Sequence, residues 1–366
     1  MTKNILTITL CLTCLEACKP PTAETAEEVA IIDVDRALRS GTKNLRISDF
    51  ADSITFIPIF DGNSAYIGDP LRMEMTSDHL FVYDMTDRLV CYDFRDRTSR
   101  QIGRRGRGPQ EYIRIEDIAA DEERDIIYAL VRNDPTGNSH IFKYDFEGRF
   151  LDDFPLDGDA YKIGLSGDGD LVVHFTNYFG NAKNQYAVMD HEGNPVTDYP
   201  NPFPYELSGG RHTFMGESAK YSYGGEFNIK DKSDTLYVFR DKGRHPRYVF
   251  KNSFSIDGRP DLTHAEYDNA FVLNYVFETN TKLMFNGHIG EPSAWRYFYY
   301  DKTTKQTHSI ESQIRNDLTD SPEFFRQITA DTTFGDCYVK ITGNPQREGD
   351  PPIEEAAHFL MLLHLK

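Results

Sequence analysis

The residues best suited to binding chemistry gather in the stretch RQIGRRGRGPQEY, residues 100–112. It places four arginines and three glycines within nine residues. A phosphate-binding P-loop has the spacing seen from Gly103 to Gly108, but it requires Lys-Ser/Thr where Pro109 and Gln110 follow here. A dinucleotide-binding fingerprint also fails, because no helix is expected after the glycines.

Nucleic acid is a poor partner for this stretch and for the whole chain. Arg-Gly segments that bind RNA occur in many copies within basic, disordered regions, whereas this chain has one copy. The 40 Lys and Arg residues are outnumbered by 58 Asp and Glu residues, and the formal net charge of −18 repels phosphates. We therefore expect no nucleic-acid partner.

The preferred interpretation of the stretch is a crossover loop between two repeated structural units. We expect its glycines to take positive φ, Pro109 to fix the exit of the loop, and Tyr112 to pack where the next unit begins. One functional hypothesis stays open beside it. Arg104, Arg105 and Arg107 would form an anion site, because guanidinium groups suit carboxylates and phosphates.

Two loop-like segments rich in aromatic residues are further binding candidates. They are TNYFGNAKNQY (176–186) and NPFPYELSGGRHTF (201–214). Tyr178, Phe179 and Tyr205 can stack on a sugar or a peptide. The alternative is that these rings pack inside the repeated units.

No catalytic or metal-binding constellation stands out in the sequence. There is no Gly-x-Ser-x-Gly elbow, and Cys91 and Cys337 lie in apolar, strand-like runs typical of buried thiols. A disulfide between these two cysteines stays open. We expect no catalytic residue, no metal site and no cofactor. The histidines of the body lack close ligand spacing, among them His174, His212, His264, His288 and His308.

The first residues are typical of a targeting segment. Lys3 supplies a positive charge, and ILTITLCLTCLEA supplies an apolar run that is too short to span a membrane. LEAC, residues 15–18, looks like the cleavage box of a bacterial lipoprotein, with Glu16 as a departure. We predict a signal peptide over residues 1–17, cleavage before Cys18 and lipidation of its thiol.

A tether and one folded body are predicted to follow. KPPTAETAEEVA is polar and rich in Pro, Thr and Glu, so residues 18–44 are assigned to the lipidated cysteine and a flexible tether. VAIIDVDRAL, near the end of the tether, is compatible with a first strand and a helical turn. The body is predicted as a single domain over residues 45–366.

The body repeats a unit made of several short strands. Apolar runs of period two recur at intervals of about 40–50 residues, a length typical of β-propeller blades. Tyr92-Asp93-Phe94 returns 52 residues later as Tyr144-Asp145-Phe146. We predict an all-β, six-bladed β-propeller of four-stranded blades. Copies of the unit lie at 79–103, 124–156, 169–200, 233–250, 280–310 and the C-terminus.

The repeated aspartates have a structural interpretation. Each Tyr-Asp element is expected to end a strand, with Asp and Gly forming the turn to the outermost strand of the unit. The repeated Asp residues are therefore assigned to turns rather than to ligands. One short helical insertion is predicted near 309–327, where Ser-Pro-Glu-Phe is typical of a helix start.

The order of four stretches resembles that in six-bladed β-propeller lipoproteins of Bacteroidetes-type bacteria, relatives of the NHL-repeat propellers. One departure is RNDLTDSPEFF, where relatives carry an Asn-Asp-Ile-Asp-Gly-Gly-like loop. The resemblance implies the fold and an envelope location, but it implies no established activity. The four stretches are ISDFADSITFIPI, IGRRGRGPQEYIRIEDIAADEERDIIYAL, SDTLYVFRDKGRHPRYVF, and KLMFNG…RYFYYDKTTKQTHSI with the terminal FLMLLHLK.

Two functional hypotheses follow. The preferred one is a lipid-anchored, non-enzymatic propeller at the cell envelope, on the outer membrane, that binds a carbohydrate, a peptide or another envelope protein. The alternative is a metal-dependent propeller hydrolase or lyase, similar to a lactonase, with Ca²⁺ or Zn²⁺ in the central channel. The alternative requires Asp, Glu, Asn or His side chains from at least three blades to converge.

Overall fold

The structure, a computed structural model, describes most of the chain from residue 29 onward. It describes residues 29–366 except for 61–64, 133–138, 178–179, 203, 205–218, 232, 256, 258–265, 267–268, 291–293, 313, 320–323, 326–331 and 344–355. No helix among the described residues is long and apolar enough to cross a membrane.

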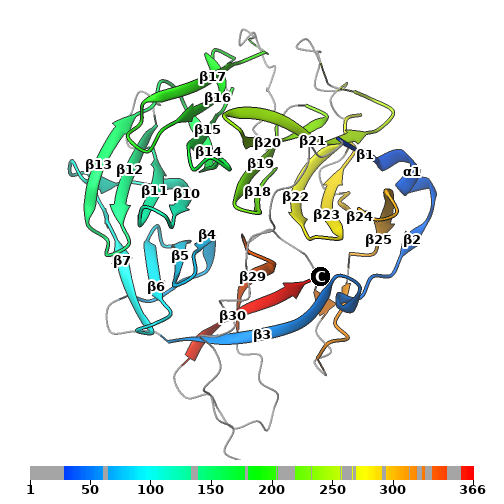
Figure 1. Cartoon of the computed structure of the whole chain (residues 1–366), viewed down its shortest axis with the longest axis horizontal. Helices are drawn as coiled ribbons and strands as arrows, with labels where there is room; N and C mark the ends of the chain where they lie inside the picture. The colour runs from blue at the N-terminus through cyan, green and yellow to red at the C-terminus, as the bar shows by residue number, and fades with distance from the viewer. Residues whose placement is uncertain are drawn as a thin grey trace, which may run out of the picture.

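The described strands form six blades around a ring (Figure 1), which confirms the predicted six-bladed propeller of four-stranded blades. Blades 1 to 3 follow one another along the chain. Blade 1 has β4 (Pro70–Met75), β5 (His79–Asp84), β6 (Leu89–Asp93) and β7 (Thr98–Ile102). Blade 2 has β10 (Ile115–Asp121), β11 (Ile126–Val131), β12 (His140–Asp145) and β13 (Phe150–Pro155). Blade 3 has β14 (Ala160–Leu165), β15 (Leu171–Phe175), β16 (Asn184–Met189) and β17 (Pro195–Pro200).

The other three blades each include a strand from the N-terminal part of the chain. Blade 4 has β18 (Ala219–Tyr223), β19 (Glu226–Lys230), β20 (Thr235–Arg240), β21 (Gly243–Lys251) and β1 (Ala30–Asp33). Blade 5 has β22 (Val272–Glu278), β23 (Lys282–His288), β24 (Arg296–Asp301), β25 (Gln306–Ile310) and β2 (Thr42–Lys43). Blade 6 has β28 (Thr332–Phe334), β29 (Cys337–Thr342), β30 (Ala356–Leu365) and β3 (Ala51–Phe60).

Blade 6 closes the ring by joining the two ends of the body. Strand β3 pairs antiparallel with β30, from Ala51 opposite Leu365 to Phe60 opposite Ala356. Figure 1 shows the blue β3 lying along the red β30. Because the outermost strand of the last blade comes from the start of the body, the ring opens only if this long ladder is broken.

Residues 30–43 extend the sheets of blades 4 and 5, although they were assigned to the tether. Strand β1 pairs in parallel with β21, and β2 pairs in parallel with β25. Between them lies α1 (Val34–Arg39), capped by Asp33, whose Oδ1 accepts a hydrogen bond from Arg36 N at 2.8 Å. Ile32 and Val34 are fully buried, and this burial holds the segment on the ring.

The strands end in turns that are organised by aspartate side chains. Asp145 Oδ1 accepts a hydrogen bond from Arg149 N at 2.8 Å, and Asp301 Oδ1 accepts one from Thr304 N at 2.8 Å. Both carboxylates are thus engaged with backbone N–H groups of their own turn. The assignment of these repeated aspartates to turn formation is confirmed.

The predicted helix near 309–327 is not found in the described part of that stretch. Instead, β26 (Ile314–Arg315) pairs antiparallel with β27 (Phe324–Phe325). Arg315 N donates a hydrogen bond to Leu45 O at 3.1 Å, and the Ile314 side chain is buried in the core. These long-range contacts favour an extended backbone over the weak helical pattern of the sequence.

The two cysteines of the body, Cys91 and Cys337, are buried and form no disulfide. Cys91 lies in the core between blades 1 and 2, whereas Cys337 packs in a different cluster with residues of blades 6 and 1. The two thiols therefore do not form the disulfide that the sequence left open. Burial raises the pKa of the Cys91 thiol to about 12, so it stays protonated and unreactive.

Candidate functional site

The arginine- and glycine-rich stretch is the connection from blade 1 to blade 2, as predicted. After β7 the chain forms β8 (Arg104–Arg105), turns, and returns as β9 (Glu111–Tyr112), which pairs in parallel with β8. The turn is held by two backbone hydrogen bonds, from Gly106 N to Tyr112 O at 3.0 Å and from Glu111 N to Gly108 O at 3.1 Å. The loop is thus a folded element at the seam of two blades.

Two glycines of this loop are required for different reasons. Gly103 has φ of +60°, and a Cβ atom there would lie 2.7 Å from the ring of Tyr144 in blade 2. Gly106 does not have positive φ, but a Cβ atom there would lie 1.9 Å from Glu111 Oε2. The expectation of positive φ is therefore correct for Gly103 alone, and Gly106 and Gly108 permit close approach of the Glu111 side chain.

Tyr112 anchors the loop, as predicted. Its side chain is fully buried, and its hydroxyl oxygen accepts a hydrogen bond from Leu89 N in blade 1 at 3.1 Å. In the same seam, the Tyr83 hydroxyl accepts a hydrogen bond from Ile115 N at 3.2 Å. Buried backbone N–H groups require a hydrogen-bond acceptor because water cannot reach them, and these two tyrosine hydroxyls supply it.

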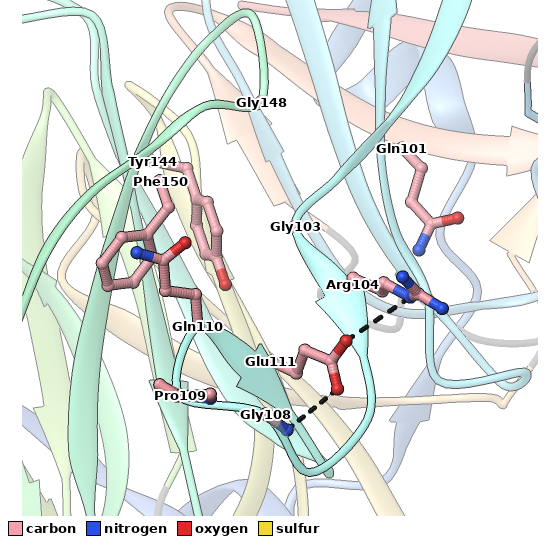
Figure 2. A pocket seen from close by; sticks show the side chains of 10 residues that line it. All are labelled: Gln101, Gly103, Arg104, Gly108, Pro109, Gln110, Glu111, Tyr144, Gly148 and Phe150. Atoms are coloured by element: carbon pink, nitrogen blue, oxygen red, sulfur yellow. Dashed lines mark hydrogen bonds and ion pairs between the residues drawn. The ribbon is translucent and has the colours of Figure 1, made fainter.

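A pocket of about 600 Å³ lies between this loop and the outer strands of blade 2 (Figure 2). One side is formed by Gln101 and by the loop residues from Gly103 to Glu111 that face it. The other side is formed by Tyr144, Gly148 and Phe150. Its volume falls in the range of small-molecule sites. We call it the seam pocket.

The polar groups of the seam pocket are mixed in charge. Arg104 Nε lies 3.5 Å from Glu111 Oε1, and Glu111 Oε2 accepts a hydrogen bond from Gly108 N at 2.9 Å (Figure 2). The Arg104 side chain is 81% exposed, so solvent screens this pair and a ligand can reach the guanidinium group. The amide side chains of Gln101 and Gln110 add neutral donors and acceptors.

The three arginines proposed as an anion site do not converge on the pocket. Only Arg104 lines it. Arg105 turns to blade 1, where its Nη2 lies 3.0 Å from Asp87 Oδ2. Arg107 is exposed on the loop and forms no ion pair with any residue that the structure describes. Since carboxylates already accompany Arg104 and Arg105, the loop offers little uncompensated positive charge.

Tyr144 is the residue of the pocket that sequence reasoning missed. Its side chain is fully buried, its ring packs edge-on against Phe150 with centroids 5.7 Å apart, and its hydroxyl has no hydrogen-bond partner among the described residues. Burial raises the pKa of this hydroxyl, so it stays protonated and able to donate. The sequence carries no signal for an unpaired hydroxyl at Tyr144, because Tyr92 holds the equivalent position in the preceding repeat and its hydroxyl is paired with the backbone at Phe60.

The remaining site residues predicted from the sequence lie outside the described residues. Tyr178, Phe179 and Tyr205 belong to the segments that the structure does not describe, and so does Cys18. The aromatic binding segments and the lipidation site therefore stay predictions.

Buried charges between blades 4 and 5 form a structural network rather than a pocket. Glu278 is buried and accepts hydrogen bonds from the Tyr221 and Tyr248 hydroxyls, both at 2.6 Å, and from Arg247 Nη2 at 3.0 Å. Burial acts to raise the pKa of Glu278, but Arg247 and Lys302 hold it below its usual value. Both oxygens of this carboxylate are therefore already engaged by described side chains.

The described residues give no support to a metal centre. No group of three His, Cys, Asp or Glu side chains comes together among them in a way that could hold a metal ion. Near the ring axis, Asp117 is already paired with Lys220 and Arg72, at 2.6 and 3.3 Å. Cations occupy the positions around this carboxylate that a bound metal ion would need, so the residues there do not fit Ca²⁺ or Zn²⁺.

Comparison with known families and proteins assigns a family but no activity. A family model described as a domain of unknown function (DUF4934) matches residues 29–342. Comparison with curated proteins gave no match.

Solved structures agree with the propeller fold. One from Bacteroides fragilis, described as an exported protein, is 15% identical, with a TM-score of 0.61 over 93% of this chain and 100% of that chain. A member of the DUF4221 family from Bacteroides vulgatus is 10% identical, with a TM-score of 0.44 over 86% of this chain and 97% of that chain. The first likeness concerns the fold alone, and the second carries no further argument.

Proposed function

The chain belongs to the DUF4934 family, and we propose that it is a lipid-anchored, extracytoplasmic binding module that takes a small neutral saccharide into the seam pocket. The blades serve as the rigid support of the pocket, and the crossover loop between blades 1 and 2 supplies one of its walls. The proposal assigns the chain no catalytic step.

The Tyr144 hydroxyl is the observation that carries this proposal. A buried hydroxyl without a partner costs free energy, and most buried polar groups in folded proteins are paired. Tyr144 is one of the residues that line a pocket of ligand size. A ligand oxygen that accepts its hydrogen bond would turn a destabilising group into a binding contact.

The chemistry of the pocket favours a saccharide over an anion, a peptide or another protein. The half-buried ring of Phe150 offers apolar surface for the C–H face of a sugar. Gln101, Gln110 and Glu111 offer the amide and carboxylate groups that bond sugar hydroxyls. Because Arg104 already lies beside Glu111, a neutral ligand disturbs the charges of the pocket least.

The location outside the cytoplasm rests on the N-terminal sequence. Residues 15–18 match a lipoprotein cleavage box except at Glu16, and the similar structure from Bacteroides fragilis is described as exported. We expect Cys18→Ala to release the protein from the membrane fraction of cells. Unchanged membrane partition of this variant would contradict the anchor without bearing on the pocket.

Saccharide binding can be tested with a panel of neutral mono- and disaccharides and saturation-transfer NMR on the purified protein. Gln110→Trp places a bulky ring at the pocket, and Gln306→Trp makes the same change at the exposed first residue of β25 in blade 5. We expect one class of saccharide to give a signal with the wild type and Gln306→Trp and to lose it with Gln110→Trp. No signal from any saccharide, or equal signals from both variants, would refute the proposal.

A further inference from the structure

Charged side chains from four innermost strands meet near the axis of the ring, far from the seam pocket in the fold. They come from blades 1 to 4, whose inner strands β4, β10, β14 and β18 lie around the centre in Figure 1. The side chains are Arg72 and Glu74 of β4, Asp117 of β10, Lys162 of β14 and Lys220 of β18. We call them the axial cluster.

Asp117 is the hub of the axial cluster. Its side chain is fully buried, with Oδ2 2.6 Å from Lys220 Nζ and Oδ1 3.3 Å from Arg72 Nε. Oδ2 also accepts a hydrogen bond from Ile163 N on the inner strand of blade 3, at 2.9 Å. Burial acts to raise the pKa of Asp117, but the surrounding cations hold it below its usual value, so the carboxylate is ionised.

Arg72 and Lys220 also have structural roles. Arg72 Nε donates a hydrogen bond to Glu116 O at 3.2 Å, and Lys220 Nζ donates one to Ile163 O at 3.0 Å. Each cation thus pairs with a backbone carbonyl on the exposed edge of a neighbouring inner strand. Their positions are therefore set by the fold, independently of any ligand.

Lys162 is not explained by this structural role. It lies next to Ile163 on β14, yet it forms no ion pair or hydrogen bond with the described residues, and its Nζ lies 4.7 Å from the Tyr161 ring. Burial, helped by Arg72 and Lys220, lowers the pKa of Lys162 to about 7 against the opposing effects of Asp117 and Glu116. The Lys162 ammonium group thus lies near two other cations and near Asp117, and it is not ion-paired with any described residue.

Glu74 does not supply the missing negative charge. It shares a face of β4 with Arg72, two residues away. Burial raises the pKa of Glu74 to about 7, with Lys220 lowering it and Asp117 raising it. Near neutral pH the cluster therefore has two cations, Arg72 and Lys220, against the anion Asp117, while Lys162 and Glu74 are both partly neutral. The nearby Glu116 carboxylate is paired with Arg114 and Arg132 instead.

We propose that the axial cluster is a binding site for an oxyanion, a carboxylate or phosphate group, held by Lys162 with Arg72 and Lys220 beside it. The side chains of Arg72 and Lys220 are 29% and 18% exposed, so solvent and a small ligand reach them, whereas Asp117 beneath them is closed off. Guanidinium and ammonium groups at fixed positions suit either oxyanion.

Binding at this site is coupled to a proton. An oxyanion beside Lys162 favours its charged form and raises its pKa, so the protein takes up a proton when the ligand binds near neutral pH. The charged groups that face Lys162 are Arg72 of β4, Asp117 and Glu116 of β10, and Lys220 of β18. Affinity for the oxyanion should therefore fall as the pH rises above neutral.

The probes for this site are sodium phosphate and sodium acetate, titrated into the purified protein by calorimetry below and above neutral pH. We expect at least one of them to bind, with phosphate and acetate distinguishing the two oxyanion classes. Lys162→Met should weaken that binding about tenfold or more, the effect of losing one charge-assisted contact. The matched control Lys251→Met, on the exposed end of β21, should bind as the wild type does.

A charge-conserving variant and an NMR titration of Lys162 test the proposal further. Lys162→Arg retains the positive charge and should retain most of the affinity, which separates loss of charge from loss of fold. In the wild type, ¹³C NMR of reductively methylated Lys162 should show its pKa rising when phosphate or acetate is saturating. Absence of binding by both probes, or equal binding by Lys162→Met and the wild type, would overturn the proposal. The saccharide experiments on the seam pocket do not depend on either result.

Discussion

Replacing Tyr144 by phenylalanine removes one buried oxygen atom that has no partner among the described residues. Tyr112 provides the matched comparison, because it is equally buried in the same seam and its hydroxyl accepts the Leu89 N–H at 3.1 Å. The two substitutions are chemically identical. They differ only in whether a hydrogen bond is broken.

The structure predicts opposite stability effects for the two variants. Tyr112→Phe leaves a buried backbone N–H unpaired, which costs about 1–3 kcal/mol. Tyr144→Phe leaves no new group unpaired and removes a hydroxyl that has no partner. The free energy of unfolding of this variant should therefore equal that of the wild type or exceed it by about 1 kcal/mol. The expected gap between the variants is therefore about 1–4 kcal/mol.

Urea denaturation of the wild type and both variants measures this gap. The transition can be followed by circular dichroism and by the fluorescence of Trp295, the single tryptophan of the chain. Tyr112→Phe should unfold at lower urea concentration than the wild type, and Tyr144→Phe should not. If both variants lose the same stability, the Tyr144 hydroxyl has a partner in the folded protein and is not held ready for a ligand.

Three other predictions concern the buried parts of the structure. Glu278→Gln leaves the buried Arg247 and the half-buried Lys302 without this carboxylate and should cost about 3–5 kcal/mol in urea unfolding. Since the pKa of Glu278 is lowered on folding, its stabilisation is present above its unfolded pKa and is lost as the pH falls through the folded value. The difference in stability between this variant and the wild type should thus shrink in acid. A difference that stays constant with pH would contradict the lowered pKa of Glu278. Gly103→Ala should cost more than Gly225→Ala by about 1–3 kcal/mol, because both glycines have positive φ but only the first would meet a ring; equal thermal midpoints would argue against the contact. Cys91 and Cys337 should react with iodoacetamide only after unfolding, and mass spectrometry of the native protein would expose early labelling.

Much of the fold could be predicted from the sequence because each blade is a local unit. The alternation of apolar residues marks strands, and Asp145 and its counterparts act through turns only a few residues long. The N-terminal arm was harder to assign. Residues 30–43 form two short parallel pairings with strands more than 200 residues away, and such pairings leave almost no local pattern.

The two candidate sites were largely invisible to the sequence, for the same reason. The seam pocket exists because Tyr144 meets the loop at Gly103 across a blade boundary. The axial cluster assembles single residues from four strands, and nothing distinguishes Asp117 or Lys162 from the other acidic and basic residues along the chain. Only the ring geometry brings these side chains together.

The affinity of Tyr144→Phe for a saccharide that binds the wild type tests the central claim most directly. Calorimetric titration should show binding about fivefold weaker than in the wild type, the value of one neutral hydrogen bond, in a variant that is no less stable. Unchanged affinity would show that the Tyr144 hydroxyl does not contact the ligand, and would contradict the assignment of the seam pocket as the binding site.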